Sequence, residues 1–465
     1  MKLGARAVLL SLLCIVALVA LQGITVVAIE RVAMLHSRVV PAQAHLGYYI
    51  NPATWGKITV AVVVGSNCLE ALALYGLFRF LPAQRTPTII KACTAAGVAA
   101  MLGISLSARL TGLDAILYIY FAKVANLGTA YHVPPSFTPV ADGFGNLYPV
   151  IRKLRFASPY GPLWELFNRG ILAGTHTIGQ ALFTIKIANA AALLACFAVL
   201  FFLRLPFRLT ALFFLNPALY DNYIVQAHND LFAILPILVA LLVARRGALT
   251  WAALLASLAG LVKISLTVVA LATIASLGNR RKRLVSASLI IAVLALGSAL
   301  IGGAPYLHAL TFVGKSQTAG SGSRVINDVR LVLQALMLVG ACFALLDAVL
   351  WKRVVRSAVW TLPAFSGLLH AWYFPWTVPF AVRFGVTAAA LAISLPLSEI
   401  ATNLRLTDLI KVDPLTLSML IIVAVAAREL IATKGRGEAF TIGSHDDEVS
   451  PRRRGDTAMG DSTTG

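Results

Sequence analysis

The sequence has 465 residues, of which 59% are hydrophobic and only 12% are charged. Because soluble globular domains carry charge on about a quarter of their residues, this composition excludes a water-soluble fold and predicts an all-α polytopic membrane protein. The net charge of +20 does not indicate nucleic-acid binding, since the Lys and Arg residues stand in short clusters at the ends of apolar runs.

Apolar runs that predict membrane-spanning helices recur along nearly the whole chain. The first, Ala7 to Ala28, is too long for the hydrophobic part of a signal peptide and lacks a small-x-small cleavage site, so we expect it to remain as a span. Several later runs are shorter than the ~20 residues of an upright span, which predicts tilted or partial crossings and about 12–14 helices in total. The later runs are Ile58 to Leu77, Ala92 to Leu106, Ala181 to Leu203, Leu209 to Leu219, Leu231 to Val243, Ala248 to Val262, Ile264 to Leu277, Leu284 to Ile301, Leu331 to Leu350, Ala358 to Leu369, Trp376 to Val382, Val386 to Leu397 and Leu415 to Ala427.

Basic clusters predict the orientation of the chain, because Lys and Arg are enriched in cytoplasmic loops. They mark alternate loops as cytoplasmic, and both termini are then cytoplasmic at the plasma (inner) membrane. Residues 433–465, rich in Gly, Ser and Asp, are predicted to form a disordered tail. The segment of about residues 110–180 falls on the non-cytoplasmic side as a large external loop with interfacial helices. The clusters are Arg79, Arg85 and Lys91; Arg204 and Arg208; Arg245 and Arg246; Arg280 to Arg283; and Lys352, Arg353 and Arg356.

The external loop carries a carboxylate and an aromatic turn. Asp114 closely follows a span, so from its position alone it is either an interfacial helix cap or a functional carboxylate at the membrane boundary. Further on, in SPYGPLWELF, turn-forming Pro and Gly residues surround Tyr160 and precede Trp164. This pattern predicts a rigid elbow that leads into an interfacial helix, with an aromatic belt at headgroup level as the structural alternative.

Polar residues next interrupt the apolar pattern in QAHND and at Lys263. Asn229 or Asp230 could cap the following helix, whereas His228 could bind a phosphate or satisfy a buried carbonyl. Lys263 stands where two short spans would meet on the outside, as a snorkelling anchor or as a cation for an anionic ligand. We favour the ligand, because the positive-inside bias makes an external Lys the exception.

The last external segments add cations and aromatics to the same face. The aromatics could form an ordinary belt and the cations could be merely solvated. Together with His228 and Lys263, however, they form a positive rim opposite Asp114, and such a rim suits a phosphate. These residues are His308, Lys315, Arg324, His370, Trp372, Tyr373 and Trp376.

The order of these elements resembles the GT-C fold polyprenol-phosphate-sugar-dependent glycosyltransferases, especially the bacterial membrane mannosyltransferases of the alpha-1,6 type. The resemblance spans about residues 92–397. It departs from the family pattern at Thr129, Ala130 and Tyr131, which replace Asn-Pro-Tyr, and Asp114 has no acidic neighbour. The matching elements are Asp114, which opens the external loop; Tyr118 and Tyr120 in a Tyr-rich helix; Gly128 with Tyr131; Tyr160 to Leu163; Asn216 with Pro217; His228 to Asp230; Val262 with Lys263; and Trp372 to Pro379.

The resemblance implies a GT-C-like catalytic region at residues 92–432, after N-terminal transmembrane helices at residues 1–91. It implies transfer of a sugar, mannose before others, from a polyprenyl-phosphate donor to a glycan or lipid acceptor on the non-cytoplasmic face, with inversion. Asp114 would be the general base. The implied donor phosphate-binding residues are His228, Lys263, Arg324 and His370, with Lys315 also possible, and the implied substrate-binding residues are Tyr118, Tyr160, Trp164, Asn229, Asp230, Trp372 and Tyr373.

No cofactor is predicted with certainty. A divalent metal at Asp114, Asp142 or Asp230 stays open, although no ligand spacing requires it. The five cysteines lie inside apolar runs without CxxC spacing. Besides donor and acceptor, the expected partners are membrane lipids.

A lipid-linked sugar flippase or secondary transporter is the alternative from another class, because it too would carry cations among many spans. Transporters place ionisable residues near the bilayer midplane and contain repeated halves. The polar clusters identified here lie at span ends on one side, and no internal repeat is evident. A non-catalytic scaffold is the third alternative.

Overall fold

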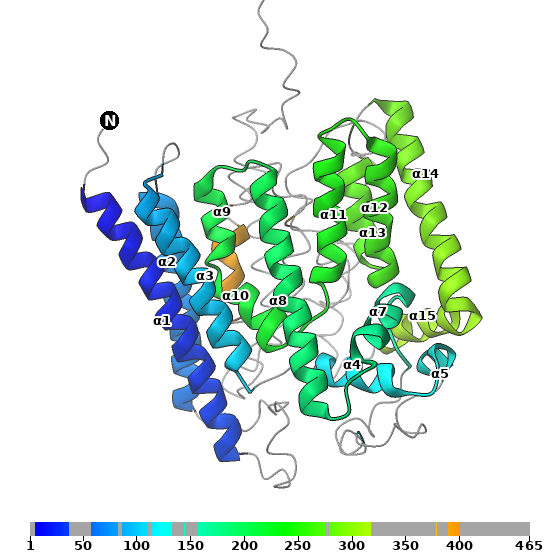
Figure 1. Cartoon of the computed structure of the whole chain (residues 1–465), viewed down its shortest axis with the longest axis horizontal. Coiled ribbons are helices and arrows are strands. Elements are labelled where there is room, and N and C mark those ends of the chain that lie inside the picture. The colour runs from blue at the N-terminus through cyan, green and yellow to red at the C-terminus, as the bar shows by residue number, and fades with distance from the viewer. Residues whose placement is uncertain are drawn as a thin grey trace, which may run out of the picture.

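The computed structural model describes residues 5–36, 57–81, 86–109, 113–132, 144, 157–275, 277, 279–317, 378, 389, 391–397 and 399. Every regular element among these residues is a helix (Figure 1), which confirms the predicted all-α fold. The predicted spans after residue 330 lie outside the described residues, apart from the helical residues of 378–399. The expected total of about 12–14 helices therefore stays a prediction.

Five helical stretches are long and apolar enough to cross a membrane. They coincide with the spans expected from Ala7, Ile58, Ala92, Ala181 and Leu284, which confirms a polytopic membrane protein. Two further apolar helices, α11 (Leu231–Ala244) and α12 (Leu249–Val262), are shorter, as tilted or partial crossings would be. The long stretches are α1 (Ala5–His36), α2 (Lys57–Phe80), α3 (Thr88–Ser107), α8 (Ile178–Phe202), and α14 (Arg280–Gly297) continued through η7 (Ser298–Gly302) into α15 (Gly303–Gln317).

Two of the predicted spans are interrupted. The run from Leu209 forms α9 (Phe207–Phe214), α10 (Pro217–Tyr220) and the π-helix η5 (Asp221–Val225), and the run from Ile264 forms α13 (Leu266–Ala270) and η6 (Leu271–Ala275). The first break has a clear cause, because Pro217 has no N–H to continue the ladder. The Asn216 side chain caps the new helix by accepting from the Ala218 N–H at 3.2 Å, and its amide donates to the Ala392 carbonyl at 2.7 Å.

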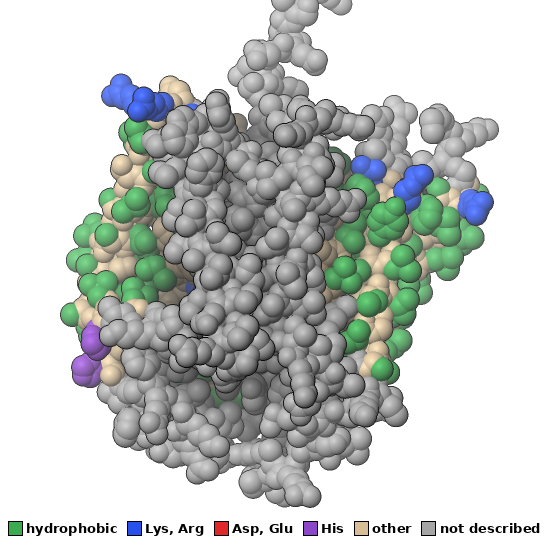
Figure 2. Space-filling view, turned by 180° about the vertical axis from the view of Figure 1, so that it is seen from behind, with side chains coloured by type: hydrophobic (Ala, Val, Ile, Leu, Met, Phe, Trp, Pro, Cys, Tyr) green, Lys and Arg blue, Asp and Glu red, His purple; other side chains and the backbone are tan. Residues whose placement is uncertain are grey.

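The helices form two groups on either side of α8. In Figure 1, α1 to α3 pack together at one edge and α11 to α14 at the other. The short helices α4 (Leu113–Lys123), α5 (Leu127–His132) and α7 (Pro162–Leu172) lie together at one end of the molecule. At the opposite end, Figure 2 shows Lys and Arg side chains above apolar flanks. The Lys and Arg side chains that Figure 2 shows thus lie at the end opposite the predicted external helices.

The two short helices that frame the site cap each other. Lys123, at the end of α4, donates from Nζ to the carbonyls of Leu172 and Thr175 at 2.7 and 2.8 Å, beyond the end of α7. The Arg169 guanidinium of α7 binds three carbonyls at the end of α4. Since the last carbonyls of a helix have no partners within it, each helix stabilises the other. The carbonyls bound by Arg169 are those of Phe121, Val124 and Asn126, at 2.8 to 3.0 Å.

Replacement of Arg169 by Met should loosen this end of the molecule. The change keeps the apolar stem but removes three charge-assisted hydrogen bonds. We therefore expect the free energy of unfolding to fall by about 2 kcal/mol or more. Thermal unfolding of the purified full-length protein would record it as a lower Tm. The matched control is Arg281→Met on the exposed start of α14, and equal Tm values for both variants would contradict the capping role.

Candidate active site

The predicted elbow lies against the end of α12. Gly161 is the N-cap of α7, and its N–H donates to the Val262 carbonyl at 2.9 Å. A Cβ at Gly161 would lie 2.1 Å from the Leu261 carbonyl oxygen, so only glycine allows this close approach. The predicted turn and the helix that follows it are both found, and their contact with α12 holds the backbone that leads directly to Lys263.

Three predicted substrate-binding aromatics come together behind the elbow. The ring of Tyr118 makes edge-to-face contacts with Tyr160 and Trp164, at centroid distances of 4.8 and 4.9 Å. All three side chains are buried, so they join α4 to α7 rather than form an exposed belt. Burial raises the pKa of the Tyr118 phenol well above its usual value, so this hydroxyl stays protonated. Its oxygen accepts from the Asn229 N–H at 3.3 Å, which ties α4 to the QAHND loop.

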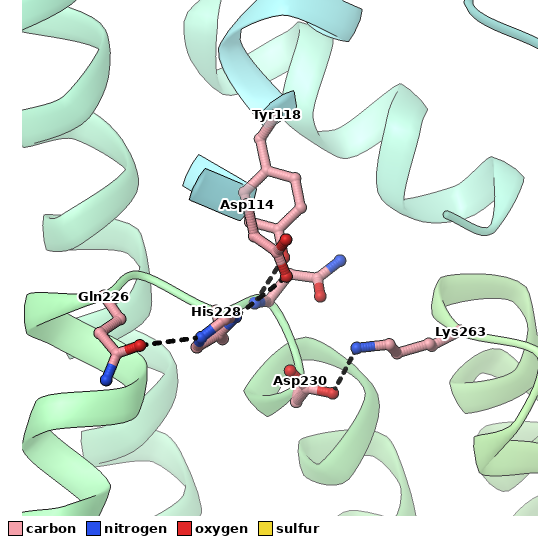
Figure 3. Close-up of polar contacts among 7 residues, drawn as sticks. Asp114, Tyr118, Gln226, His228, Asp230 and Lys263 are labelled. Atoms are coloured by element: carbon pink, nitrogen blue, oxygen red, sulfur yellow. Dashed lines mark hydrogen bonds and ion pairs between the residues drawn. The ribbon is translucent and has the colours of Figure 1, made fainter. Parts of the chain in front are cut away.

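Asp114 and His228 form a direct pair. The His228 Nδ1 lies 3.1 Å from the Asp114 Oδ2, and the His228 Nε2 lies 3.4 Å from the Gln226 Oε1 (Figure 3). When Nδ1 carries a proton, it donates to the carboxylate and fixes its orientation. Asp114 is 27% exposed while His228 is 3% exposed, so the carboxylate is the accessible member. Asp114 lies in the first turn of α4, where a negative charge also favours the helix dipole.

The backbone before His228 is strained. Ala227 has a φ of 59°, in the left-handed region that costs a residue with a Cβ about 1 kcal/mol or more. The π-helix η5 ends just before it, and π-helical turns recur at functional sites. The His228 N–H then donates to the Asn222 carbonyl at 3.1 Å. This unusual backbone turns His228 toward Asp114.

Lys263 and Asp230 form the second pair. The Lys263 Nζ lies 2.8 Å from the Asp230 Oδ1, and both side chains are largely withdrawn from solvent (Figure 3). Lys263 does not snorkel to the surface. Asp230 occupies the N-cap of α11, but its side chain makes no cap hydrogen bond, so the capping expected of it is not found. Its carboxylate instead faces the lysine.

Asn229 is fully buried between these pairs. Its side-chain Oδ1 and Nδ2 have no hydrogen-bond partner in the structure, so it does not cap α11 either. An unsatisfied buried amide costs roughly 1–3 kcal/mol, and such groups are rare in folded proteins. The site therefore holds a polar group positioned for a partner.

The structure does not describe several of the other predicted residues. Arg324, His370, Trp372 and Tyr373 lie outside the described residues, as does Asp142. Nothing is described for the Lys315 side chain. Within the described part of the chain, no group of three or more His, Cys, Asp or Glu side chains is placed to hold a metal ion.

Sequence reasoning missed a buried carboxyl in α7. Glu165 is fully buried and accepts from the Ser158 hydroxyl at 2.5 Å. Burial raises its pKa to about 7, so it is partly protonated near neutrality. Sequence reasoning also missed the contact of Gln226 with His228. The basic residues Lys123 and Arg169, in the last turns of short helices, did offer a signal, because Lys and Arg there often bind the final carbonyls.

Gly161→Ala should disrupt this site. The added methyl group would meet backbone atoms of Leu261 and Val262, which cannot yield as a side chain would. We expect a Tm lower by several degrees and a loss of activity as the Lys263 segment shifts. Gly170→Ala is the matched control, because nothing lies within 4 Å of its Cβ position. Equal Tm values and equal activities of the two variants would show that the close approach of Gly161 to the Leu261 backbone is unimportant.

The family model of the alpha-(1->6)-mannopyranosyltransferase N-terminal domain matches residues 154–279. The matched stretch contains the elbow, the His228 loop and Lys263, whereas Asp114 precedes it. No curated protein and no solved structure matches the chain. The matched family agrees with the resemblance seen in the motifs, and the apolar helices agree with a membrane enzyme. The match over residues 154–279 and the apolar helices together indicate a membrane glycosyltransferase that is similar to the alpha-mannosyltransferases.

Proposed function

We propose that the protein transfers mannose from a polyprenyl-phosphate donor to a glycan or lipid acceptor, with inversion, on the non-cytoplasmic side of the plasma membrane. The observation that carries the proposal is the pairing of an accessible carboxylate, Asp114, with His228 beside the buried Lys263–Asp230 pair. The helix α4, whose first turn carries Asp114, lies at the end of the molecule opposite the Lys and Arg side chains of Figure 2, which supports the assigned face.

Asp114 is the general base. It accepts the proton of the acceptor hydroxyl as that oxygen bonds to the anomeric carbon and the bond from this carbon to the phosphate oxygen breaks. The electron pair leaves with the polyprenyl phosphate, which needs no proton because it is a weakly basic anion. The hydrogen bond from His228 supports this role, since it holds the carboxylate in one orientation at the accessible edge.

Lys263 and His228 stabilise the charge that grows on the leaving phosphate. An ammonium group has three donors, so Lys263 can bind a phosphate oxygen without giving up Asp230. The pair also lowers the cost of keeping Lys263 charged in a site withdrawn from water. Cations aimed at developing charge in such a site are a large source of rate enhancement. Arg324 and His370 are further proposed phosphate ligands.

Asn229 binds a sugar hydroxyl. Its buried amide offers one acceptor and two donors without partners, and it stands between the two charged pairs. A hydroxyl can both donate to the amide oxygen and accept from the amide nitrogen. Asp230, Tyr118, Tyr160 and Trp164 shape this position from behind, and Trp372 and Tyr373 are proposed to complete it.

Asp114→Asn should fold normally and lose transfer. The amide oxygen can still accept from His228, but it cannot take a proton from the acceptor, so we expect a fall of roughly 10²–10⁴-fold. The assay follows labelled product from polyprenyl-phosphate mannose in membranes that contain the full-length protein. Asp447→Asn, in the tail predicted to be disordered, is the control. Normal transfer by Asp114→Asn would exclude this base, and donor movement across the bilayer without a new glycosidic bond would favour the transporter.

Asn229→Ala should separate stability from activity. The change removes an unsatisfied buried amide, so Tm should stay equal or rise, while transfer should fall about tenfold or more as a substrate hydrogen bond is lost. Asn189→Ala on α8 is the control, because its buried amide oxygen also lacks a partner but lies outside the His228 loop. A normal transfer rate for Asn229→Ala would contradict the assigned contact.

A further inference from the structure

Three carboxyl groups meet inside the membrane-spanning part of the molecule. Glu70 of α2 and Glu399 are 1% and 5% exposed, and Asp221 of η5 is half-buried. Glu70 lies within electrostatic range of both other carboxyls. Charged side chains are costly at such positions and often mark function. The proposed transfer reaction uses none of the three.

Amides and hydroxyls, not cations, surround these carboxyls. The Gln22 amide of α1 donates to the Asp221 Oδ1 at 2.7 Å, and the Asn222 amide donates to Glu399. Within the described part of the chain, no Lys, Arg or His forms an ion pair with any of the three. Lys186 on α8, which packs against η5, instead donates to the Ala108 carbonyl at 2.6 Å.

Several buried acceptors of this cluster have no hydrogen-bond donor. The Gln22 Oε1, the Asn222 Oδ1 and the Glu70 Oε1 are buried and have no hydrogen-bond partner, and the Thr25 hydroxyl, which lies near Glu70, can supply only one donor. The amide nitrogens of Gln22 and Asn222 bond to cluster carboxyls, so their free oxygens also belong to the cluster. Ionised carboxylates would add acceptors and repulsion, whereas neutral carboxyl groups supply the missing O–H donors.

We infer that Glu70, Asp221 and Glu399 form a proton-binding site within the transmembrane region, whose neutral carboxyl groups hold η5 in place. Protons fit better than a metal ion, because no metal-holding group of His, Cys, Asp or Glu exists among the described residues. The other titratable side chains near η5 include Tyr223 on η5 itself, Tyr220 at the end of α10, and Cys196 of α8 and Asp230, which lie within electrostatic range of Tyr223; α8 also carries Lys186.

The cluster connects directly to the catalytic loop. The Asn222 carbonyl accepts from the His228 N–H at 3.1 Å, and the Asp221 carbonyl accepts from the Gln226 N–H at 2.8 Å. Loss of protons would place like charges on three adjacent segments and push η5 away. His228 would then move relative to Asp114. The site thus couples protons in the membrane to the geometry of the external pair.

Glu70→Gln tests the site, since glutamine mimics the protonated acid. The wild-type folded state keeps protons that the unfolded chain releases, so its Tm should fall as the pH rises between about 5 and 9. We expect Glu70→Gln in the full-length protein to flatten this fall and to raise Tm by several degrees at the alkaline end. Infrared spectra should also lose a protonated-carboxyl carbonyl band. Glu399→Gln is the second variant, should Glu70→Gln fail to fold.

The direction of the Tm change in a control variant distinguishes a proton-binding carboxyl from an ordinary ionised carboxylate. Glu30→Gln on α1 neutralises a carboxylate that interacts with Lys186, so it should lower Tm without flattening the pH profile. The pH effect of Glu165 remains in every variant and cancels in the comparison. An unchanged pH profile in both cluster variants would overturn the inference. So would a wild-type Tm that falls with EDTA and recovers with Mg²⁺, since it would identify a metal site.

Discussion

The external site depends on the contact between α4 and α7, in which a basic side chain of each helix binds the carbonyls at the end of the other. Both helices end where backbone carbonyls lack partners, and Lys123 and Arg169 each supply the donors that the other helix needs. A short helix is marginal by itself, so this mutual capping gives α4 a fixed direction. Asp114 lies at the other end of the same helix. The capping therefore determines where the carboxylate points.

Each carboxylate of the site has a basic partner, His228 for Asp114 and Lys263 for Asp230. In a site with little water, an isolated charge would be costly, and each pair offsets much of that cost. In the reaction we propose, a phosphate enters such a site by sharing a cation that is already charged and oriented. The substrate then finds a prepared environment, and little reorganisation is left for the chemical step.

The sequence predicted the uninterrupted spans because hydropathy alone decides them, as in α1 and α8. It also singled out Asp114, His228 and Lys263, because polar residues in apolar surroundings stand out and their order matched a family pattern. The sequence could not predict which of these residues pair with each other. Asp114 and His228 are 114 residues apart, and which helix ends meet depends on packing that periodicity does not encode. Glu70 escaped notice because one carboxyl in an apolar helix shows no partner until distant segments pack beside it.

The bonds from Asn216 and Asn222 to residues 392 and 399 reach across 176 and 177 positions of the chain. During synthesis, the break at Pro217 and the π-helix enter the membrane long before the segment that satisfies them is made. Until then, the Asn216 amide nitrogen lacks the Ala392 carbonyl, whereas the Asn222 amide can already donate to the Ala218 carbonyl, 2.7 Å away on the same segment. The order of synthesis therefore leaves the Asn216 amide without this acceptor until the C-terminal segment is inserted.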